Sequence, residues 1–489
     1  MNANQTRTLL ARTGLDPTEA ELQGFESRSQ NDAAQWLVQH AKRNTAVLAL
    51  PEWTQQSATL LSQRQAMTEP QRQAYRMAQN QAMQELRQWW LKQMLATSTP
   101  LAERMEVFWH NHFVSSQLKV QDAHAMLNQH QLLRKHALGS FREMLFDLAQ
   151  DPAMLVYLDG AQNRVQAPNE NFAREVMELF TLGEGNYTET DVKEAARGFA
   201  GWTVNPQTNR FVNDLRRRDT GGKTVLGKAV QTGEDVLNQL LAQPACAKFL
   251  VEKLWREFVS PTPNSAAVQR IASRFRDSNY DIATALTALL AEPAVLSPDN
   301  EAALVKSPVE LLVGTARRFG VLVNDATPLM LAAASMGQIL FAPPNVKGWQ
   351  IGTAWIDANT LLARKQAIAR LFGFADPSRP NATMNRMQSQ VAANDMTGNA
   401  ADLPRRFRNP PRSVGKETLA TGQVAPMVFD PQVWLIARGI DPLNTVREPM
   451  RGQFIAEVLH TAPALPPDSS LEGLPLLRAL VADAAYQVK

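Results

Sequence analysis

The sequence predicts an all-α protein, with one large, irregular multi-helix domain and one small β-hairpin or flap near residues 203–228. Three observations support this fold class. Apolar residues recur at spacings of three and four through most of the chain. Residues typical of helix N-caps, and prolines suited to a first turn, stand ahead of several of these stretches. The stretches are short and no repeat period joins them, which favours an irregular helical domain over a coiled coil.

The first strong helical pattern covers residues 70–97, where Met83, Leu86 and Trp90 share one face. Thr68 is a start signal ahead of this helix. Pro100 opens the next helix at a position where its missing N–H costs nothing. Further helices are expected at residues 131–150, 169–182, 189–200, 234–258, 264–277, 283–292, 306–319, 327–340, 354–372, 448–460 and 471–486.

Two segments break the helical pattern. Residues 203–228 carry β-branched and aromatic residues around Asp219–Gly222, which predicts a hairpin or an extended flap. Residues 376–430 are rich in Pro, Asn, Gly and Ser and show no sustained period, so they are a linker or a long excursion. We therefore predict a main helical domain at 1–375, this irregular segment at 376–430 and a small C-terminal helical segment at 431–489.

Composition limits the class of protein. A chain of 489 residues is longer than the roughly 250–300 residues at which a single core stops growing. Hydrophobic residues make up 44% and charged residues 20%, which are values of globular proteins. The net charge of +3 is small for this length, so no nucleic-acid partner is expected.

The single cysteine, Cys246, excludes an intrachain disulfide and a cysteine-based metal cluster. The N-terminal residues lack the apolar run of a signal peptide. No window approaches the roughly 18 apolar residues that a membrane span needs. We expect a soluble protein that is cytoplasmic as written, or periplasmic or exported if a leader was removed or a partner carries it.

The first candidate motif is Phe108-Trp-His-Asn-His-Phe113. On a helix, His112 continues the apolar stripe of Met105 and Phe108, whereas His110 lies roughly 160° away around the axis. Both imidazoles can bind one metal ion only if the helix ends or distorts there. The alternative is one histidine in the core and one at the surface.

The second candidate motif covers residues 169–183, with Asn169 as N-cap and Gly183 as stop signal. The predicted buried stripe consists of Phe172, Val176, Leu179 and Phe180. At its edge, Asn171, Glu175 and Glu178 place two carboxylates and an amide on one side.

A ladder of ion pairs joining Glu170, Arg174 and Glu178 would explain part of this motif structurally. It does not explain Glu175, which has no basic residue four positions away in either direction. A buried carboxylate needs a compensating cation, a hydrogen-bond network or a proton. The options are a metal ion held with histidine from a second helix, an arginine such as Arg134, or a neutral carboxyl that acts as a general acid.

Several segments together are similar to the bacterial domain-of-unknown-function family 1800. The resemblance covers roughly residues 8–372 and a short C-terminal remnant. It is carried by FWHNHF at 108–113, RKHALGSFREML at 134–145, DPAMLVYLDG at 151–160, PNENFAREVMELFTLGEGNYTETDV at 168–192, ARGFAGWTV at 196–204, KSPVELLV at 306–313 and GQILFAPPNVKGW at 337–349.

The resemblance implies a large α-helical fold without an established activity. It also implies export in many members and a partner from family 1501, which looks like a phosphatase. Where the family usually has histidine before the Asp-x-Gly turn, this chain has Arg218 before Asp219. The family's motif residues correspond here to His110, His112, His136, Asn171, Glu175, Glu178 and Trp202.

The leading hypothesis from the sequence is a metal-dependent enzyme, a hydrolase or an oxidoreductase, with one or two divalent cations. Its candidate catalytic residues are Glu175, Glu178 and His112. Its candidate metal ligands are His110, His112, His136, Glu175 and Glu178. Asn171, Arg174, Trp202 and Arg134 would contact the substrate or support the ligands.

Two alternatives remain open. The chain could be a non-enzymatic scaffold, or an assembly partner of the phosphatase-like protein, whose polar motif is a structural network. It could also be a metal-free acid/base enzyme that acts on a glycan or a phosphoester. The three hypotheses differ in whether the motif side chains face an open space or already have all their hydrogen bonds and ion pairs made by neighbouring residues.

Overall fold

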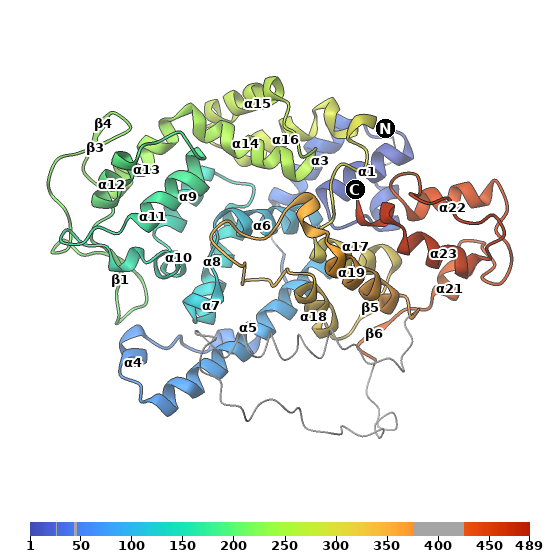
Figure 1. Cartoon of the computed structure of the whole chain (residues 1–489), viewed down its shortest axis with the longest axis horizontal. Coiled ribbons are helices and arrows are strands. Elements are labelled where there is room, and N and C mark those ends of the chain that lie inside the picture. The colour runs from blue at the N-terminus through green and yellow to red at the C-terminus, as the bar shows by residue number, and fades with distance from the viewer. Residues whose placement is uncertain (26, 44–45, 375–424) are drawn as a thin grey trace.

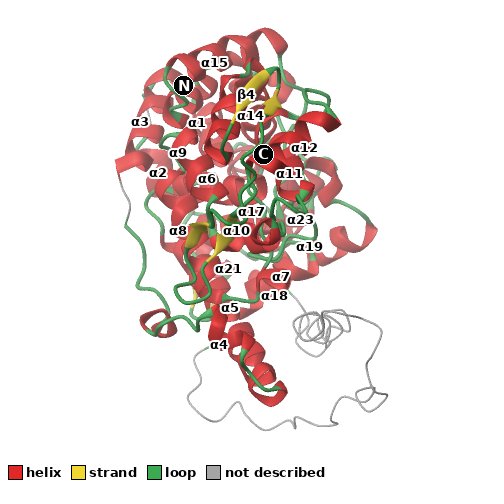
Figure 2. Ribbon diagram, turned by 90° about the vertical axis from the view of Figure 1, so that its left-hand side faces the viewer, coloured by secondary structure: helices red, strands yellow, loops and turns green. Residues whose placement is uncertain are grey.

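The computed structural model describes residues 1–25, 27–43, 46–374 and 425–489, and the predicted all-α class is confirmed. Helices dominate the described part of the molecule, where only short strands interrupt them (Figure 2). Most of the predicted irregular segment at 376–430, namely residues 376–424, lies outside the described residues. The division into three domains remains a prediction.

The described N-terminal residues form five α-helices that precede the first motif. They are α1 (Ala3–Thr13), α2 (Glu19–Gln23), α3 (Gln30–Arg43), α4 (Leu61–Gln65) and α5 (Glu69–Ala96). The long α5 matches the predicted helix at 70–97. Thr68 caps it in a capping box with Gln71, which satisfies two donors at the helix start.

The central part of the chain begins with α6 (Pro100–His112), which lies in the middle of the molecule (Figure 1), and continues with further helices. They are α7 (Gln117–Val120), α8 (Ala123–His136), α9 (Phe141–Ala149), α10 (Pro152–Tyr157), α11 (Glu170–Glu175), the π-helical η3 (Val176–Leu182), α12 (Glu189–Gly198), α13 (Gly233–Ala242), α14 (Pro244–Phe258), α15 (Ser265–Asp277) and α16 (Ile282–Leu290).

Two predicted helices are each divided in the structure. The segment 131–150 is split between α8 and α9, where Ser140 caps the new helix through the Glu143 amide. The segment 234–258 is split at Pro244, which occupies the first turn of α14. Proline cannot supply the amide that a continuous helix needs, so a new helix begins there.

The segment 202–230 forms two hairpins where one was predicted. Strands β1 (Trp202–Val204) and β2 (Phe211–Asn213) pair antiparallel, as do β3 (Lys223–Val225) and β4 (Lys228–Val230). The tight turn of the second hairpin lies at Leu226 and Gly227, which both have positive φ. The Asp219–Gly222 stretch, predicted as the turn, instead connects the two hairpins.

The remaining α-helices follow in the C-terminal third of the described chain, and α17 reaches α6 through the Arg104–Glu310 ion pair. They are α17 (Pro308–Phe319), α18 (Thr327–Ser335), α19 (Ala358–Leu371), α21 (Pro431–Ile436), α22 (Met450–Val458) and α23 (Gly473–Ala482). Strand β5 (Leu322–Val323) pairs with β6 (Met427–Val428), so residues that precede residues 375–424 in the sequence contact residues that follow them. The C-terminal helices agree with the predictions at 448–460 and 471–486.

A buried charge cluster fastens the C-terminal helices to the N-terminal part, so that both termini lie on the same side of the molecule (Figure 1). The Asp16 carboxylate accepts hydrogen bonds from Lys306 Nζ at 2.8 Å and from His460 Nε2 at 2.7 Å. All three side chains are buried. Lys306 and His460 hold the pKa of Asp16 well below its usual range, although burial acts in the opposite direction.

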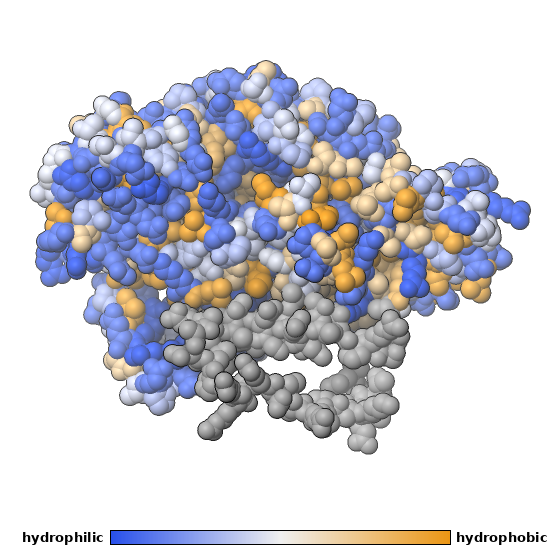
Figure 3. All heavy atoms as spheres, viewed as in Figure 1, coloured by the Kyte–Doolittle hydropathy of each residue, from blue (hydrophilic) through white to orange (hydrophobic). Residues whose placement is uncertain are grey.

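On the face of the molecule shown in Figure 3, hydrophobic residues are scattered among hydrophilic ones. No helix in the described ranges has both the length and the apolar character that a membrane crossing requires.

Replacing Asp16 with Asn should lower the free energy of unfolding by about 3 kcal/mol, because the buried Lys306 ammonium then lacks its counter-charge. Glu184→Gln is the matched control, since Glu184 pairs with Lys347 on the surface and should contribute less than about 1 kcal/mol. Urea unfolding at pH 7 measures both values. Equal losses in the two variants would show that the Asp16 cluster does not hold the ends of the chain together.

Candidate functional site

The two motif helices lie side by side, and His112 connects them. Its Nε2 atom is 3.1 Å from the carbonyl oxygen of Phe180 in η3. Its Nδ1 atom is 2.9 Å from Nζ of Lys253 on α14. Because the Lys253 ammonium can only donate, Nδ1 accepts and Nε2 carries the proton that is donated to Phe180. His112 therefore joins three helices with both ring nitrogens occupied.

Burial and a neighbouring cation keep this imidazole neutral. His112 is 1% exposed, and burial together with Lys253 lowers its pKa well below the usual value. Burial, followed by Arg256, lowers the pKa of Lys253 to about 8. Lys253 was not among the predicted site residues, because it lies on a helix far along the chain and no local pattern links it to His112.

The Phe180 carbonyl is available to His112 because it lies in the last turn of η3, where the final carbonyls of a helix have no amide partner within it. Within this π-helical segment the Thr181 hydroxyl donates to the Val176 carbonyl at 2.7 Å. A π-helix also has more residues per turn than the α-helix that was predicted. Met177 is consequently buried while Leu179 is partly exposed, which corrects the predicted buried stripe.

Glu175 and Glu178 are partly exposed, whereas His112 is buried. Glu178 accepts a hydrogen bond from the Tyr187 hydroxyl. The Glu175 carboxylate has no hydrogen bond or ion pair with any described residue, and burial followed by the charge of Glu178 raises its pKa. In the described part of the chain, neither carboxylate contacts the His112 ring.

His110 is buried in a different part of the core, so the alternative in which one histidine of the motif lies at the surface is wrong. Its Nε2 atom is 3.1 Å from Nδ1 of His130 on α8. The other ring nitrogen of His130 lies 3.2 Å from Glu106. Burial lowers the pKa of His110 to about 3, so this ring is neutral at ordinary pH.

Arg134 completes this second network and does not contact Glu175. Its guanidinium donates to Glu103 at 3.0 Å and to Glu106 at 2.8 Å. Burial and the neighbouring Glu103 raise the pKa of Glu106 well above its usual value. The spacing of Glu103, Glu106 and His110 along α6 places them on one face, and this pattern in the sequence could have predicted a second buried face.

The remaining predicted residues each have their own partners. His136 Nε2 is 2.7 Å from Asp147 on α9. Arg174 pairs with Glu170 as the ladder predicts, but its strongest pairing is with both carboxylate oxygens of Glu189 at 2.7 Å. The predicted contact with Glu178 is replaced by this pair.

Asn171 and Trp202 both contact protein groups within the fold. The Asn171 amide donates to the Leu158 carbonyl at 3.1 Å and thereby fixes the loop before α11. Trp202 is 1% exposed and packs against the rings of Phe172, Phe199 and Phe211.

The five predicted metal ligands are thus distributed over four separate places. His112 lies with Lys253, His110 with His130, and His136 with Asp147, while Glu175 at the end of α11 and Glu178 in η3 are partly exposed. Among the described residues, no group of three or more His, Cys, Asp or Glu side chains is arranged to hold a metal ion. The metal centre therefore remains a prediction from the sequence.

Comparison with known proteins identifies the family. The pattern of the family described as "Protein of unknown function (DUF1800)" matches residues 8–436. The chain belongs to the DUF1800 family. No curated protein and no solved structure matches it.

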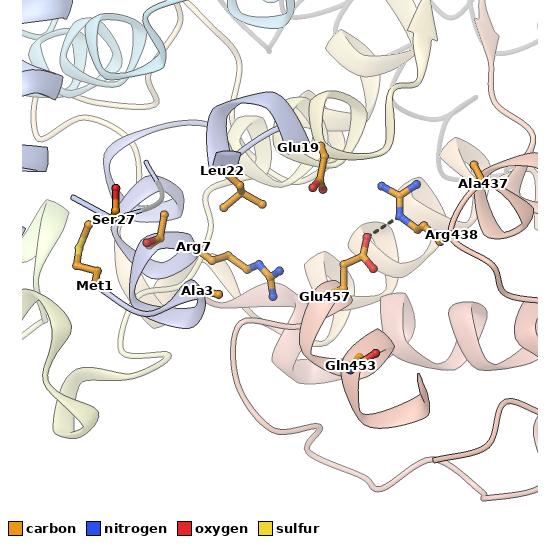
Figure 4. A pocket seen from close by; sticks show the side chains of 11 residues that line it. Met1, Ala3, Arg7, Glu19, Leu22, Ser27, Ala437, Arg438, Gln453 and Glu457 are labelled. Carbon is orange, nitrogen blue, oxygen red and sulfur yellow. Dashed lines mark hydrogen bonds and ion pairs between the residues drawn. The ribbon is translucent and has the colours of Figure 1, made fainter. Parts of the chain in front are cut away.

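A cavity of about 820 Å³ in this DUF1800 chain lies far from the motif residues, between α1 and α2 on one side and α21 and α22 on the other. Figure 4 shows Arg7 and Glu19 facing Arg438 and Glu457, with the last two joined by an ion pair. The Arg7 guanidinium also donates to the Ala456 carbonyl. This cavity separates the N-terminal and C-terminal helices, and none of the predicted site residues lines it.

The buried histidines should make the protein sensitive to mild acid. The native pKa values of His110, about 3, and His460, about 4, lie below the ordinary value near 6.5. As the pH falls from about 6.5 towards 4, these two histidines therefore become protonated in the unfolded chain but stay neutral in the native protein. At pH 5 each such histidine should cost about 2 kcal/mol of stability relative to pH 7.5.

Urea unfolding at pH 7.5, 6 and 5 tests this expectation. His110→Gln should make the decline between pH 6 and pH 5 shallower by about 1 kcal/mol. A stability that is constant over this range would show that the histidines bind protons equally in the folded and unfolded states.

Proposed function

We propose that this protein is a non-enzymatic helical scaffold or assembly protein, and that its buried histidines specify the fold. One observation supports this most strongly: His112 is enclosed, and both of its ring nitrogens are bonded to protein groups. A metal ligand or a general base needs a free nitrogen lone pair that faces a substrate or an ion. In His112 that lone pair accepts a hydrogen bond from Lys253.

The network of His110 supports the same conclusion. His110, His130, Glu106, Arg134 and Glu103 form a continuous polar chain between α6 and α8. Buried polar contacts of this kind hold two helices in one register and require no substrate, although Glu103 Oε2, Glu106 Oε1 and His130 Nε2 make no hydrogen bond with a described residue. Such networks are also costly when one member is removed, because the remaining groups are left buried without a partner.

The partner that this proposal implies is the phosphatase-like family 1501 protein suggested by the sequence resemblance. In an assembly of this type, the DUF1800 chain would supply a rigid helical surface and the partner would supply the chemistry. The rigid core around α6 would serve to hold that surface in one shape.

Replacing His112 with Phe should lower the free energy of unfolding by about 3 kcal/mol, since the Phe180 carbonyl and the Lys253 ammonium are then left unpaired. His124→Phe is the control, because His124 makes one exposed hydrogen bond to Gln56 and should cost less than about 1 kcal/mol. Addition of EDTA should leave both wild type and variants unchanged. A protein that is purified with about one metal ion per chain, and loses that ion in His112→Phe, would contradict the scaffold proposal.

A second candidate function is metal-free acid/base chemistry at Glu175, acting on a glycan or a phosphoester. The observation that favours it is a half-buried carboxyl without a partner whose pKa is raised by burial and by Glu178. A raised pKa lets a carboxyl hold a proton for a leaving group near neutral pH. The second carboxylate, on Glu178, lies on the same outer side of η3.

Hydrolysis of p-nitrophenyl glycosides and of p-nitrophenyl phosphate tests this second candidate. Glu175→Gln should reduce the rate at least about 100-fold if Glu175 donates the proton. Glu170→Gln, which removes only an exposed pairing with Arg174, should retain the wild-type rate. Equal rates in the wild type and in Glu175→Gln would remove Glu175 from any catalytic role.

A further inference from the structure

The cavity of about 820 Å³ between the two ends of the chain is lined by charged side chains that reach its open space. Helices α1 and α2 form one side, and the residues after α21 form the other side together with α22 (Figure 4). Glu19 is exposed, and Arg7, Arg438 and Glu457 are partly exposed. Neither family membership nor the scaffold proposal assigns this cavity a role.

The C-terminal side of the cavity carries an ion pair that is complete in itself. Arg438 Nε donates to the Glu457 carboxylate at 2.5 Å. The guanidinium carbon of Arg438 also lies 3.7 Å from the centroid of the Trp434 ring, which holds the side chain in place. Arg438 and Glu457 therefore compensate one another, and together they add no net charge to the cavity.

The N-terminal side carries a cation and a carboxylate that do not form an ion pair. The Arg7 guanidinium donates to the neutral Ala456 carbonyl and has no ion-pair partner among the described residues. Glu19 accepts a long hydrogen bond from Gln23 at 3.4 Å and likewise has no ion-pair partner in the described part of the chain. Both side chains point into the same space (Figure 4). The cavity thus presents one positive and one negative group that remain uncompensated.

A second guanidinium strengthens the positive end of the cavity. Burial, followed by the charge of Arg318, lowers the pKa of Arg7. The terminal nitrogens of Arg318 are buried and make no hydrogen bond with a described residue, so Arg318 acts on the cavity through its charge and not by contact. Two like charges near one another favour an anion beside Arg7. Because Glu457 and Glu19 also act on Arg7, a singly charged anion is favoured over a multiply charged one.

We propose that this cavity binds a short peptide by its two free ends, with the terminal carboxylate at Arg7 and the terminal ammonium at Glu19. A guanidinium binds a carboxylate through two parallel hydrogen bonds, and an ammonium donates to a carboxylate. Ser27 and Gln453 in the lining can bond to peptide groups, and Leu22 can contact an apolar side chain. The volume equals about 27 waters at about 30 Å³ each, so a peptide of about three residues fits with room for solvent.

Other classes of ligand match the four charges less well. A phosphate would bring two negative charges towards Glu19 and Glu457. A simple amine would place a cation in the field of Arg7 and Arg318. A neutral molecule would leave both Arg7 and Glu19 without an opposite charge. A ligand with one charge of each sign, held apart by a polar backbone, compensates both groups at once.

Isothermal titration calorimetry of the full chain tests the proposal with trialanine, triglycine and trileucine, and with inorganic phosphate as the anionic comparison. At least one of the free tripeptides should bind saturably below about 10 mM. The N-acetylated and the C-amidated forms of that peptide each lack one charge and should each bind about tenfold more weakly. Phosphate should bind more weakly than the free peptide.

Two variants connect each peptide end to its residue. Arg7→Gln should weaken binding of the free peptide about tenfold but leave binding of the C-amidated form as in the wild type. Glu19→Gln should weaken binding of the free peptide about tenfold but leave binding of the N-acetylated form unchanged. Glu69→Gln is the matched control, since Glu69 pairs with Arg72 and Arg76 on α5 and does not line the cavity.

Thermal unfolding of each variant establishes that it is folded. If Arg7→Gln does not fold, the exposed Glu19→Gln variant and the N-acetylated peptide decide the question alone. The proposal is overturned if no free tripeptide binds at concentrations up to about 50 mM, or if phosphate alone binds. It is equally overturned if blocked and free peptides bind alike, or if Glu19→Gln binds the free peptide as tightly as Glu69→Gln does. Either result leaves the scaffold proposal untouched, because that proposal rests on His112 and not on this cavity.

Discussion

The structure depends on the burial of α6 on all of its sides. No residue of this helix is fully exposed, although it carries Glu103, Arg104, Glu106, His110 and His112. A helix that is buried all round is normally apolar. Each polar side chain of α6 must therefore be neutral or have a partner of opposite charge, because an unpaired buried charge is very costly.

The packing around α6 follows from this requirement. Lys253 from α14 reaches His112, His130 and Arg134 from α8 reach the opposite face, and Glu310 from α17 reaches Arg104. Each neighbouring helix contributes a group that compensates a particular side chain of α6. Helices from distant parts of the chain are thereby fixed in register as well as in contact, which is the role best attested for buried polar groups.

This requirement also explains why the motif residues do not form one centre. The features that mark His112 and Glu175 in the sequence, namely a titratable group at the edge of an apolar stripe, are shared by catalytic residues and by members of structural networks. His112 is closed off by its partners, whereas Glu175 retains an unsatisfied carboxyl. The side-chain oxygen of Asn111, between the two histidines, instead accepts from the Trp349 backbone amide and holds that loop against α6.

The sequence by itself determined the helical class, most helix positions and the kinship with the DUF1800 family, because three- and four-residue periodicity and cap residues act locally. It also indicated that Glu175 lacks an ion-pair partner along its helix. It placed a hairpin turn wrongly at Asp219–Gly222 and gave no sign of Lys253 or of the π-helical turn.

Only the tertiary structure decided which polar groups meet. A helical pattern gives the face on which a side chain lies but not which distant residue covers that face. His112 could therefore be expected in the core from its spacing, but its pairing with Lys253, more than a hundred residues later in the chain, arises only when α14 packs against α6 and η3.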